Sequence, residues 1–183
     1  MNSEIELIRS ELDTVCPRIT EEAVAGCCRE LGAAARVFVA GAGRSGFMAS
    51  AFAMRLVHLG YAVHVVGEAT APAFAEGDVL VGVSGSGNTS GTVRAAGEAR
   101  RARGRVVAVT TDVDSELAAA ADAVLLVPAA TKNRAAGEAA TAQPLSSLFD
   151  QAVHLALDAV CLRLAAEAGI DNAAARGAHV KTE

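Results

Sequence analysis

The sequence predicts an α/β protein in which a five-stranded parallel sheet lies between two layers of helices. Short valine-rich segments alternate with longer amphipathic segments along the chain, and this alternation is typical of parallel sheets buried on both faces. Two predicted strands end directly in glycine-rich turns, GAGRSG at 41–46 and SGSGNTS at 84–90. We therefore expect a three-layer αβα sandwich.

The N-terminal residues 3–32 are expected to form two helices. Residues 3–15 carry apolar side chains at helical spacing, and Pro17 ends this segment. Thr20 is a suitable N-cap for the second helix, which is expected to end near Gly32. Because this pair precedes the first strand, it is expected to lie across the sheet or against another subunit.

The core, about 33–168, contains the alternating pattern. Strands are predicted at 36–40, 61–66, 79–83, 105–110 and 123–127, and helices at 45–59, 88–102, 114–121 and 145–168. The loop 128–143 is long enough to carry function. The tail 169–183 is polar and alanine-rich, so we expect it to be mobile or to pack on a neighbouring subunit.

Composition narrows the function. The chain has 183 residues, the length of a single domain spanning 1–183. A net charge of −5 and 3% aromatic residues argue against nucleic-acid binding. No apolar run has membrane-spanning length, and the acidic N-terminus does not resemble a signal peptide, so a cytoplasmic protein is expected. The four cysteines and four histidines lack metal-site spacing, and we predict no metal.

The second glycine-rich turn is typical of an anion site. It follows the strand at 79–83 and opens a helix near Asn88, and helix N-termini present free N–H groups. The turn contains no lysine or arginine, which suits one phosphate monoester held by hydroxyls and backbone. Turn and N-cap chemistry alone is the structural alternative. The residues expected to bind phosphate are Ser45, Ser84, Gly85, Ser86, Gly87, Asn88 and Thr89.

The first turn has the spacing G-x-G-x-x-G, which also occurs in dinucleotide-binding proteins. Glu68 lies near the place of the acidic residue of that fingerprint, but the serine-rich turn has no role in such a scheme. Turns that leave neighbouring parallel strands meet in one crevice. We therefore expect Gly43 and Arg44 to join the same site, with Arg44 on substrate hydroxyls or on an adjacent chain.

Five blocks of sequence occur in the order and spacing of a known family. They are GAGRSG, FAMRLVHLG at 52–60, VGE at 66–68, SGSGNTS and QPLSSLFDQ at 143–151. Together they resemble the 6-phospho-3-hexuloisomerases of the sugar isomerase (SIS) domain family, over about residues 3–170. The resemblance implies a flavodoxin-like fold and isomerisation of D-arabino-hex-3-ulose 6-phosphate to fructose 6-phosphate, the formaldehyde-fixing step of the ribulose monophosphate pathway. It also implies no cofactor and a homo-oligomer, a tetramer or dimer.

The last block departs from the family pattern, which usually reads QPMGSLFEQ. Leu145, Ser146 and Asp150 replace Met, Gly and Glu, and that Glu is the family's catalytic carboxylate. Asp150 is therefore the expected base. The alternative is a capping box, in which Asp150 bonds back to the start of its own helix near Ser147. The family's closing Arg-His-Ala-Asn segment is also altered, to Arg-Gly-Ala-His at 176–179.

Three further residues are candidates. His58 ends the helix 45–59 and is expected either to move a proton between the two substrate oxygens or to interact only with the helix dipole. Glu68 is expected to be a second carboxylate near the sugar or a strand-end residue. Lys132 is a candidate substrate contact in the long loop. The alternative functions are an isomerase of another substrate, such as arabinose 5-phosphate, and a non-catalytic protein that binds sugar phosphates.

Overall fold

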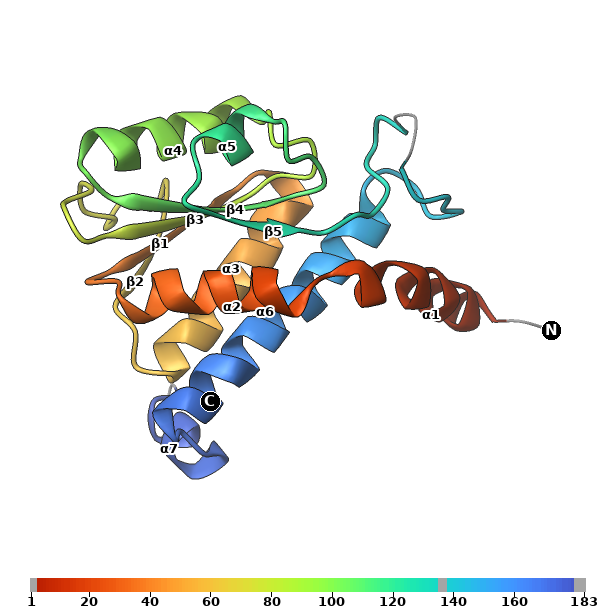
Figure 1. Cartoon of the computed structure of the whole chain (residues 1–183). Helices are drawn as coiled ribbons and strands as arrows, with labels where there is room; N and C mark the ends of the chain where they lie inside the picture. The colour runs from red at the N-terminus through yellow and green to blue at the C-terminus, as the bar shows by residue number, and fades with distance from the viewer. Residues whose placement is uncertain (1–2, 135–137, 180–183) are drawn as a thin grey trace.

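A five-stranded, all-parallel sheet forms the centre of the computed structural model, which describes residues 3–134 and 138–179 (Figure 1). The strand order is β2-β1-β3-β4-β5. The strands are β1 (Val37–Gly41), β2 (Val63–Val65), β3 (Val79–Val83), β4 (Arg105–Thr110) and β5 (Ala123–Leu126). The predicted α/β class and the number and direction of the strands are confirmed.

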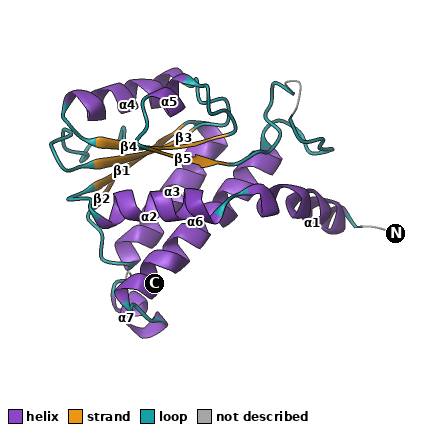
Figure 2. Ribbon diagram, viewed as in Figure 1, coloured by secondary structure: helices purple, strands orange, loops and turns teal. Residues whose placement is uncertain are grey.

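Helices cover both faces of this sheet, as Figure 2 shows. One layer contains α2 (Glu21–Gly32), α3 (Gly43–His58) and α6 (Ser147–Ala168), and the other contains α4 (Ser90–Arg101) and α5 (Glu116–Ala119). The helix α1 (Glu4–Val15) extends past the sheet beside the start of α6 and joins α2 through a short turn, η1 (Cys16–Arg18). No helix in the described ranges is long and apolar enough to cross a membrane.

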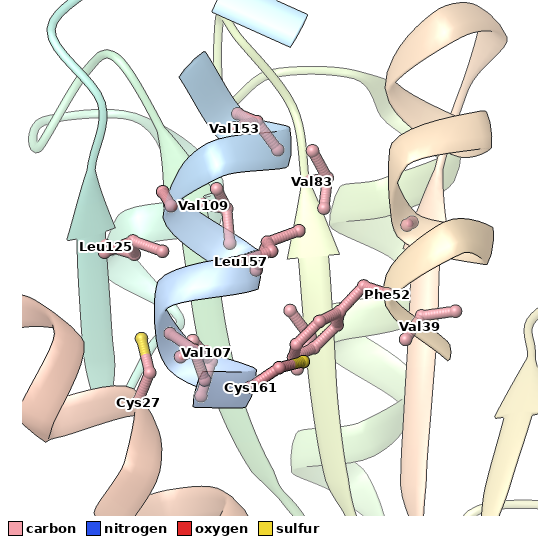
Figure 3. Packing of buried hydrophobic residues seen from close by; sticks show 14 of the residues in the cluster. Cys27, Val39, Phe52, Val83, Val107, Val109, Leu125, Val153, Leu157 and Cys161 are labelled. Carbon is pink, nitrogen blue, oxygen red and sulfur yellow. The ribbon is translucent and has the colours of Figure 1, made fainter. Parts of the chain in front are cut away.

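The alternation of side chains along each strand divides the core between these layers. Val39 of β1 faces the α2, α3 and α6 side, whereas its neighbour Phe38 faces the α4 and α5 side. Figure 3 shows the larger cluster, where Val153 and Leu157 of α6 pack with strand valines such as Val83. The central strands β1, β3 and β4 are buried at nearly every position, as the sequence pattern predicts, whereas the edge strands β2 and β5 are largely half-buried.

The switch point of the sheet lies between β1 and β3. Their register pairs Val37 with Val79 and Gly41 with Val83, so both strands end at the same level. The following helices, α3 and α4, leave toward opposite faces of the sheet. A crevice therefore opens at the carboxyl ends of these two strands, which is the usual ligand position in such sheets.

Helix ends differ from the predicted bounds by a few residues, and the tail differs in kind. The sequence favours a mobile or donated tail, but Asp171 caps a short helix, α7 (Asn172–Gly177), which contacts α3 of the same chain. The side chain of Thr20 caps α2 as predicted. The predicted loop 128–143 and tail 169–183 both include residues that lie outside the described ranges.

Candidate functional site

A cleft with a volume of about 410 Å³ opens where β1 and β3 end. It unites predicted site residues from two separate turns with the start of α6 and the loop after β5. The predicted residues that line it are Gly43, Arg44, Ser45, Ser84, Gly85, Ser86, Thr89, Lys132 and Asp150. Segments that the sequence places far apart thus share one cleft, as the strand order requires.

Three helices begin at this cleft without a side-chain cap. The N-cap residues Ala42 of α3, Thr89 of α4 and Ser146 of α6 make no side-chain cap hydrogen bond. The four helices that begin elsewhere, α1, α2, α5 and α7, are each capped by a serine, threonine or aspartate side chain. Uncapped first turns leave N–H groups and the positive end of the helix dipole for an anion.

The serine-rich turn keeps a hydroxyl pair at the floor of the cleft. The Oγ of Ser84 and the Oγ1 of Thr89 lie 2.8 Å apart, and Ser84 is buried. This bond explains why Thr89 does not cap α4 itself. Because the pair holds two protons and makes one hydrogen bond, one O–H remains for a ligand.

The backbone of this turn is anchored from the neighbouring strand. The carbonyl of Gly85 accepts hydrogen bonds from the N–H and Oγ1 of Thr111 at 3.0 and 2.9 Å. Gly87 has a φ of +64°, and a Cβ there would lie 2.0 Å from the Oγ of Ser115. Glycine is therefore required at Gly87 both for conformation and for space.

Asp150 places a buried carboxylate at the first turn of α6. Its Oδ1 accepts a 2.7 Å hydrogen bond from the Oγ of Ser45, and its Oδ2 lies 3.9 Å from the Nε of Arg44. Burial raises the pKa of Asp150, while the Ser45 hydrogen bond and the Arg44 charge act in the opposite direction. The capping-box alternative is not what the structure shows, because this carboxylate contacts α3 across the cleft.

Arg44 extends over the mouth of the cleft and is about half exposed. Its Nη1 donates a 3.3 Å hydrogen bond to the Oγ of Ser147. The guanidinium therefore has donors left for substrate oxygens while its charge stays near Asp150. The substrate contact expected of Arg44 stays a prediction, and the cleft that Arg44 lines belongs to its own chain.

Two residues that hold the loop beside the cleft escaped the sequence analysis. The carboxylate of Glu11 in α1 accepts hydrogen bonds from the Oγ1 of Thr141, the N–H of Ala142 and the Nε2 of Gln143, at 2.6 to 2.9 Å. Arg134 donates to the carbonyls of Thr131, Gln143 and Leu145. The signal for Glu11 was its position three residues after Ile8 and four before Val15, on the apolar face of α1, where a solvated acid is not expected.

The remaining predicted residues lie outside the cleft lining. The Oδ1 of Asn88 accepts from the N–H of Glu116, so this side chain holds the start of α5. Glu68 is exposed in the turn that follows β2. His58 lies 13 residues after Ser45 on α3, about 20 Å along the helix axis, where its ring contacts that of His179 at a centroid distance of 5.0 Å. Burial, with His179 and Arg55, lowers the pKa of His58.

The SIS domain model matches residues 30–155, which include β1, the serine-rich turn and Asp150. The chain belongs to the SIS domain family. This confirms the family resemblance drawn from the five sequence blocks.

Two curated SIS-type relatives carry the same name. A protein of Mycobacterium gastri named 3-hexulose-6-phosphate isomerase is 43% identical over 160 residues, covering 87% of this chain and 80% of the relative. A protein of that name from Bacillus subtilis is 38% identical over 165 residues, covering 90% and 89%. A solved structure described as a hypothetical protein superposes with a TM-score of 0.88 at 35% identity, covering 97% of this chain and 95% of the other.

Proposed function

We propose that this SIS domain is a 6-phospho-3-hexuloisomerase, which interconverts D-arabino-hex-3-ulose 6-phosphate and fructose 6-phosphate. The observation that carries the proposal is the buried carboxylate of Asp150 beside a cleft where three uncapped helices begin. The names of the two relatives support the choice of substrate. The reaction would serve formaldehyde fixation through the ribulose monophosphate pathway.

The phosphate would bind between the two glycine-rich turns. Ser84, Ser86 and Thr89 offer hydroxyls on one side, and the first turn of α3 offers N–H groups on the other. A phosphate fixed there would leave the sugar chain to extend toward Asp150 and Lys132, which line the same cleft. Fixing one end of an open-chain ketose orients the reacting carbons at the other.

Asp150 would act as the base that moves the carbonyl. Its carboxylate would remove the proton from C2 of the hexulose, and the C3 carbonyl oxygen would take up a proton to give an enediol. The O–H proton at C2 would then leave, C2 would become the carbonyl, and Asp150 would return its proton to C3. A carboxylate whose pKa is raised by burial is a better base for this task than one in water.

The oxygen-to-oxygen proton transfer needs a second group. Arg44 reaches the cleft, whereas His58 lies at the far end of α3. If His58 is catalytic, it would therefore act in the cleft of a second copy. Glu68 also lies outside the cleft lining, so it would reach a sugar only in the same way. This arrangement fits the proposed homo-oligomer, a dimer or a tetramer.

An exposed apolar groove supports assembly. It has a volume of about 530 Å³ and lies between the η1 and α2 segment and α6. Leu155 and Leu162, one heptad apart on α6, line the groove and are 47% and 73% exposed. Large apolar side chains in one exposed stripe are typical of a protein interface, and the proposed occupant is a second copy of this chain.

Turnover by the purified chain tests the function. The hexulose 6-phosphate and arabinose 5-phosphate are each supplied as substrate, and the ketose or aldose product is measured in a coupled assay. We expect fructose 6-phosphate from the hexulose and little turnover of the pentose. Preference for the pentose would favour the related isomerase. Binding of fructose 6-phosphate without any turnover would favour a sugar-phosphate sensor, for which the short side chain of Asp150 is the supporting observation.

A further inference from the structure

The hydroxyl of Ser45 faces two acceptors that it cannot serve together. In this structure it donates to the Oδ1 of Asp150 at 2.7 Å. Ser45 also lines the cleft with Ser84, Ser86 and Thr89, at the uncapped start of α3 where the phosphate would bind. A serine hydroxyl has one proton to donate, and both a carboxylate and a phosphate dianion require donors.

We propose that Ser45 is a positioning residue that links the anion site to Asp150: its proton holds the carboxylate before substrate binds and turns to the phosphate when substrate binds. This inference rests on the proposed function, because it takes the phosphate position from it. Binding energy from the non-reacting end of the substrate is then used to free the base at the reacting end. A small phosphorylated molecule would release Asp150, whereas an unphosphorylated sugar would not.

The other groups around Asp150 do not replace Ser45. Arg44 lies 3.9 Å from Oδ2, beyond hydrogen-bond distance, and already donates to Ser147. Ser147 itself donates to the carbonyl of Pro144 at 2.8 Å. Among the described residues, Ser45 makes the one hydrogen bond to this carboxylate. Losing that bond disfavours the ionised carboxylate, so phosphate binding would make Asp150 more basic.

The test measures the titration of Asp150 directly. The chain is labelled with carboxyl-¹³C aspartate, and the Asp150 resonance is assigned by its loss in Asp150→Asn. Titrations are run with and without saturating sulfate, which keeps two negative charges throughout the titration. Ser45→Ala removes the donor, and its fold is expected to survive because alanine is the best helix former and is smaller than serine. Ser50→Ala is the matched control, since Ser50 lies on α3 and donates only to Gly46.

Without sulfate, we expect the Asp150 pKa to be higher in Ser45→Ala than in the wild type. Sulfate should raise it in both, because its charge disfavours a second anion, but the rise should be larger in the wild type. The Asp150 pKa values of the wild type and Ser45→Ala should therefore converge when sulfate is bound, while the pKa in Ser50→Ala follows that of the wild type. Equal rises in Ser45→Ala and wild type would overturn the inference, since the Ser45 bond would then persist in the complex.

The experiment also distinguishes a failure of this linkage from a failure of the proposed function. Sulfate binding is monitored independently through the amide resonances of the turn 84–89. If these do not respond, the anion site of the proposed function fails and the linkage fails with it. If they respond but the pKa values do not converge, the anion site stands and only the linkage is lost. Ser45→Thr, which keeps the hydroxyl, is expected to restore the wild-type pattern.

Discussion

The hydroxyl of Ser45 donates to the carboxylate of Asp150 across 2.7 Å, which joins the start of α3 to the start of α6. The two residues are separated by 105 positions in the sequence, and the sheet's switch point brings them together. The proposed phosphate site and a buried carboxylate thus share one hydrogen bond.

Asp150→Asn should abolish most of the activity while preserving the fold. Loss of a general base is expected to lower kcat about 100- to 10,000-fold. The control is Asp158→Asn on the same helix, because Asp158 is exposed and pairs only with His154. Turnover of the hexulose 6-phosphate should be unchanged in the control. Full turnover by Asp150→Asn would show that Asp150 is not the base.

Asp150→Asn should also stabilise the protein near pH 7. The folded-state pKa of Asp150 is raised by burial, with Ser45 and Arg44 opposing. The contribution of Asp150 to folding stability is therefore complete when the pH lies below its usual pKa of 3.8. It is lost as the pH rises through the raised folded-state pKa. Denaturant titrations should show a higher free energy of unfolding for the variant than for the wild type at pH 7, and no such difference near pH 3. A difference of the same size at both pH values would contradict the raised pKa of Asp150.

Glu11→Gln should loosen residues 141–143, which precede the cleft-lining Leu145 and Ser146. Burial alone would raise the pKa of Glu11, but hydrogen bonds from Thr141, the Ala142 N–H and Gln143 lower it overall. Glutamine presents an NH₂ group to these donors, so we expect a loss of about 1 kcal/mol, or roughly 2–4 °C in Tm. The exposed Glu6→Gln on the same helix serves as the control, and thermal unfolding at pH 7 is the measurement.

The same contact predicts an acid dependence. Because the folded-state pKa of Glu11 is lowered, its stabilisation is present above the usual value of 4.5 and is lost as the pH falls through the folded-state value. The Tm difference between wild type and Glu11→Gln should therefore shrink below pH 4.5. A difference that stays constant down to pH 3 would show that the charge of Glu11 is not what holds residues 141–143.

Gly87→Ala should damage the anion site. Its φ of +64° costs a non-glycine residue about 1–2 kcal/mol, and the new Cβ would overlap Ser115. We expect weaker sulfate binding in a calorimetric titration and a lower Tm. Gly97→Ala in α4 is the control, because its Cβ would meet nothing closer than 3.8 Å and should stabilise the helix by about 0.5–1 kcal/mol. Undiminished sulfate affinity in Gly87→Ala would argue against a phosphate site in this turn.

Leu162→Glu should weaken assembly. The substitution places a charge in the exposed groove between η1 and α6, so light scattering should show a smaller particle than the wild type at equal concentration. Val113→Glu changes another exposed apolar residue, one that does not line this groove, and should leave the mass unchanged. A wild-type chain that is monomeric at all concentrations would refute the proposed interface.

Local signals explain what could be predicted from the sequence. The two glycine-rich turns and the Thr20 cap depend on neighbouring residues, and they lie where the sequence indicates. The contact of Asp150 could not be read locally, because the spacing from Ser147 fits a capping box equally well. Glu11 was missed because its partners lie about 130 positions away. His58 stays a prediction for the cleft of a second copy, since helix length places it at the opposite end of α3 from Ser45.

Solvent exchange tests the central claim most directly. Fructose 6-phosphate is incubated with the protein in D₂O, and the C3 proton is followed by NMR over many turnovers. An enediol formed by Asp150 predicts loss of the C3–H signal with the wild type and with Asp158→Asn, and no loss with Asp150→Asn. Exchange by Asp150→Asn at the wild-type rate, or a wild type that binds fructose 6-phosphate and never exchanges C3–H, would contradict this account.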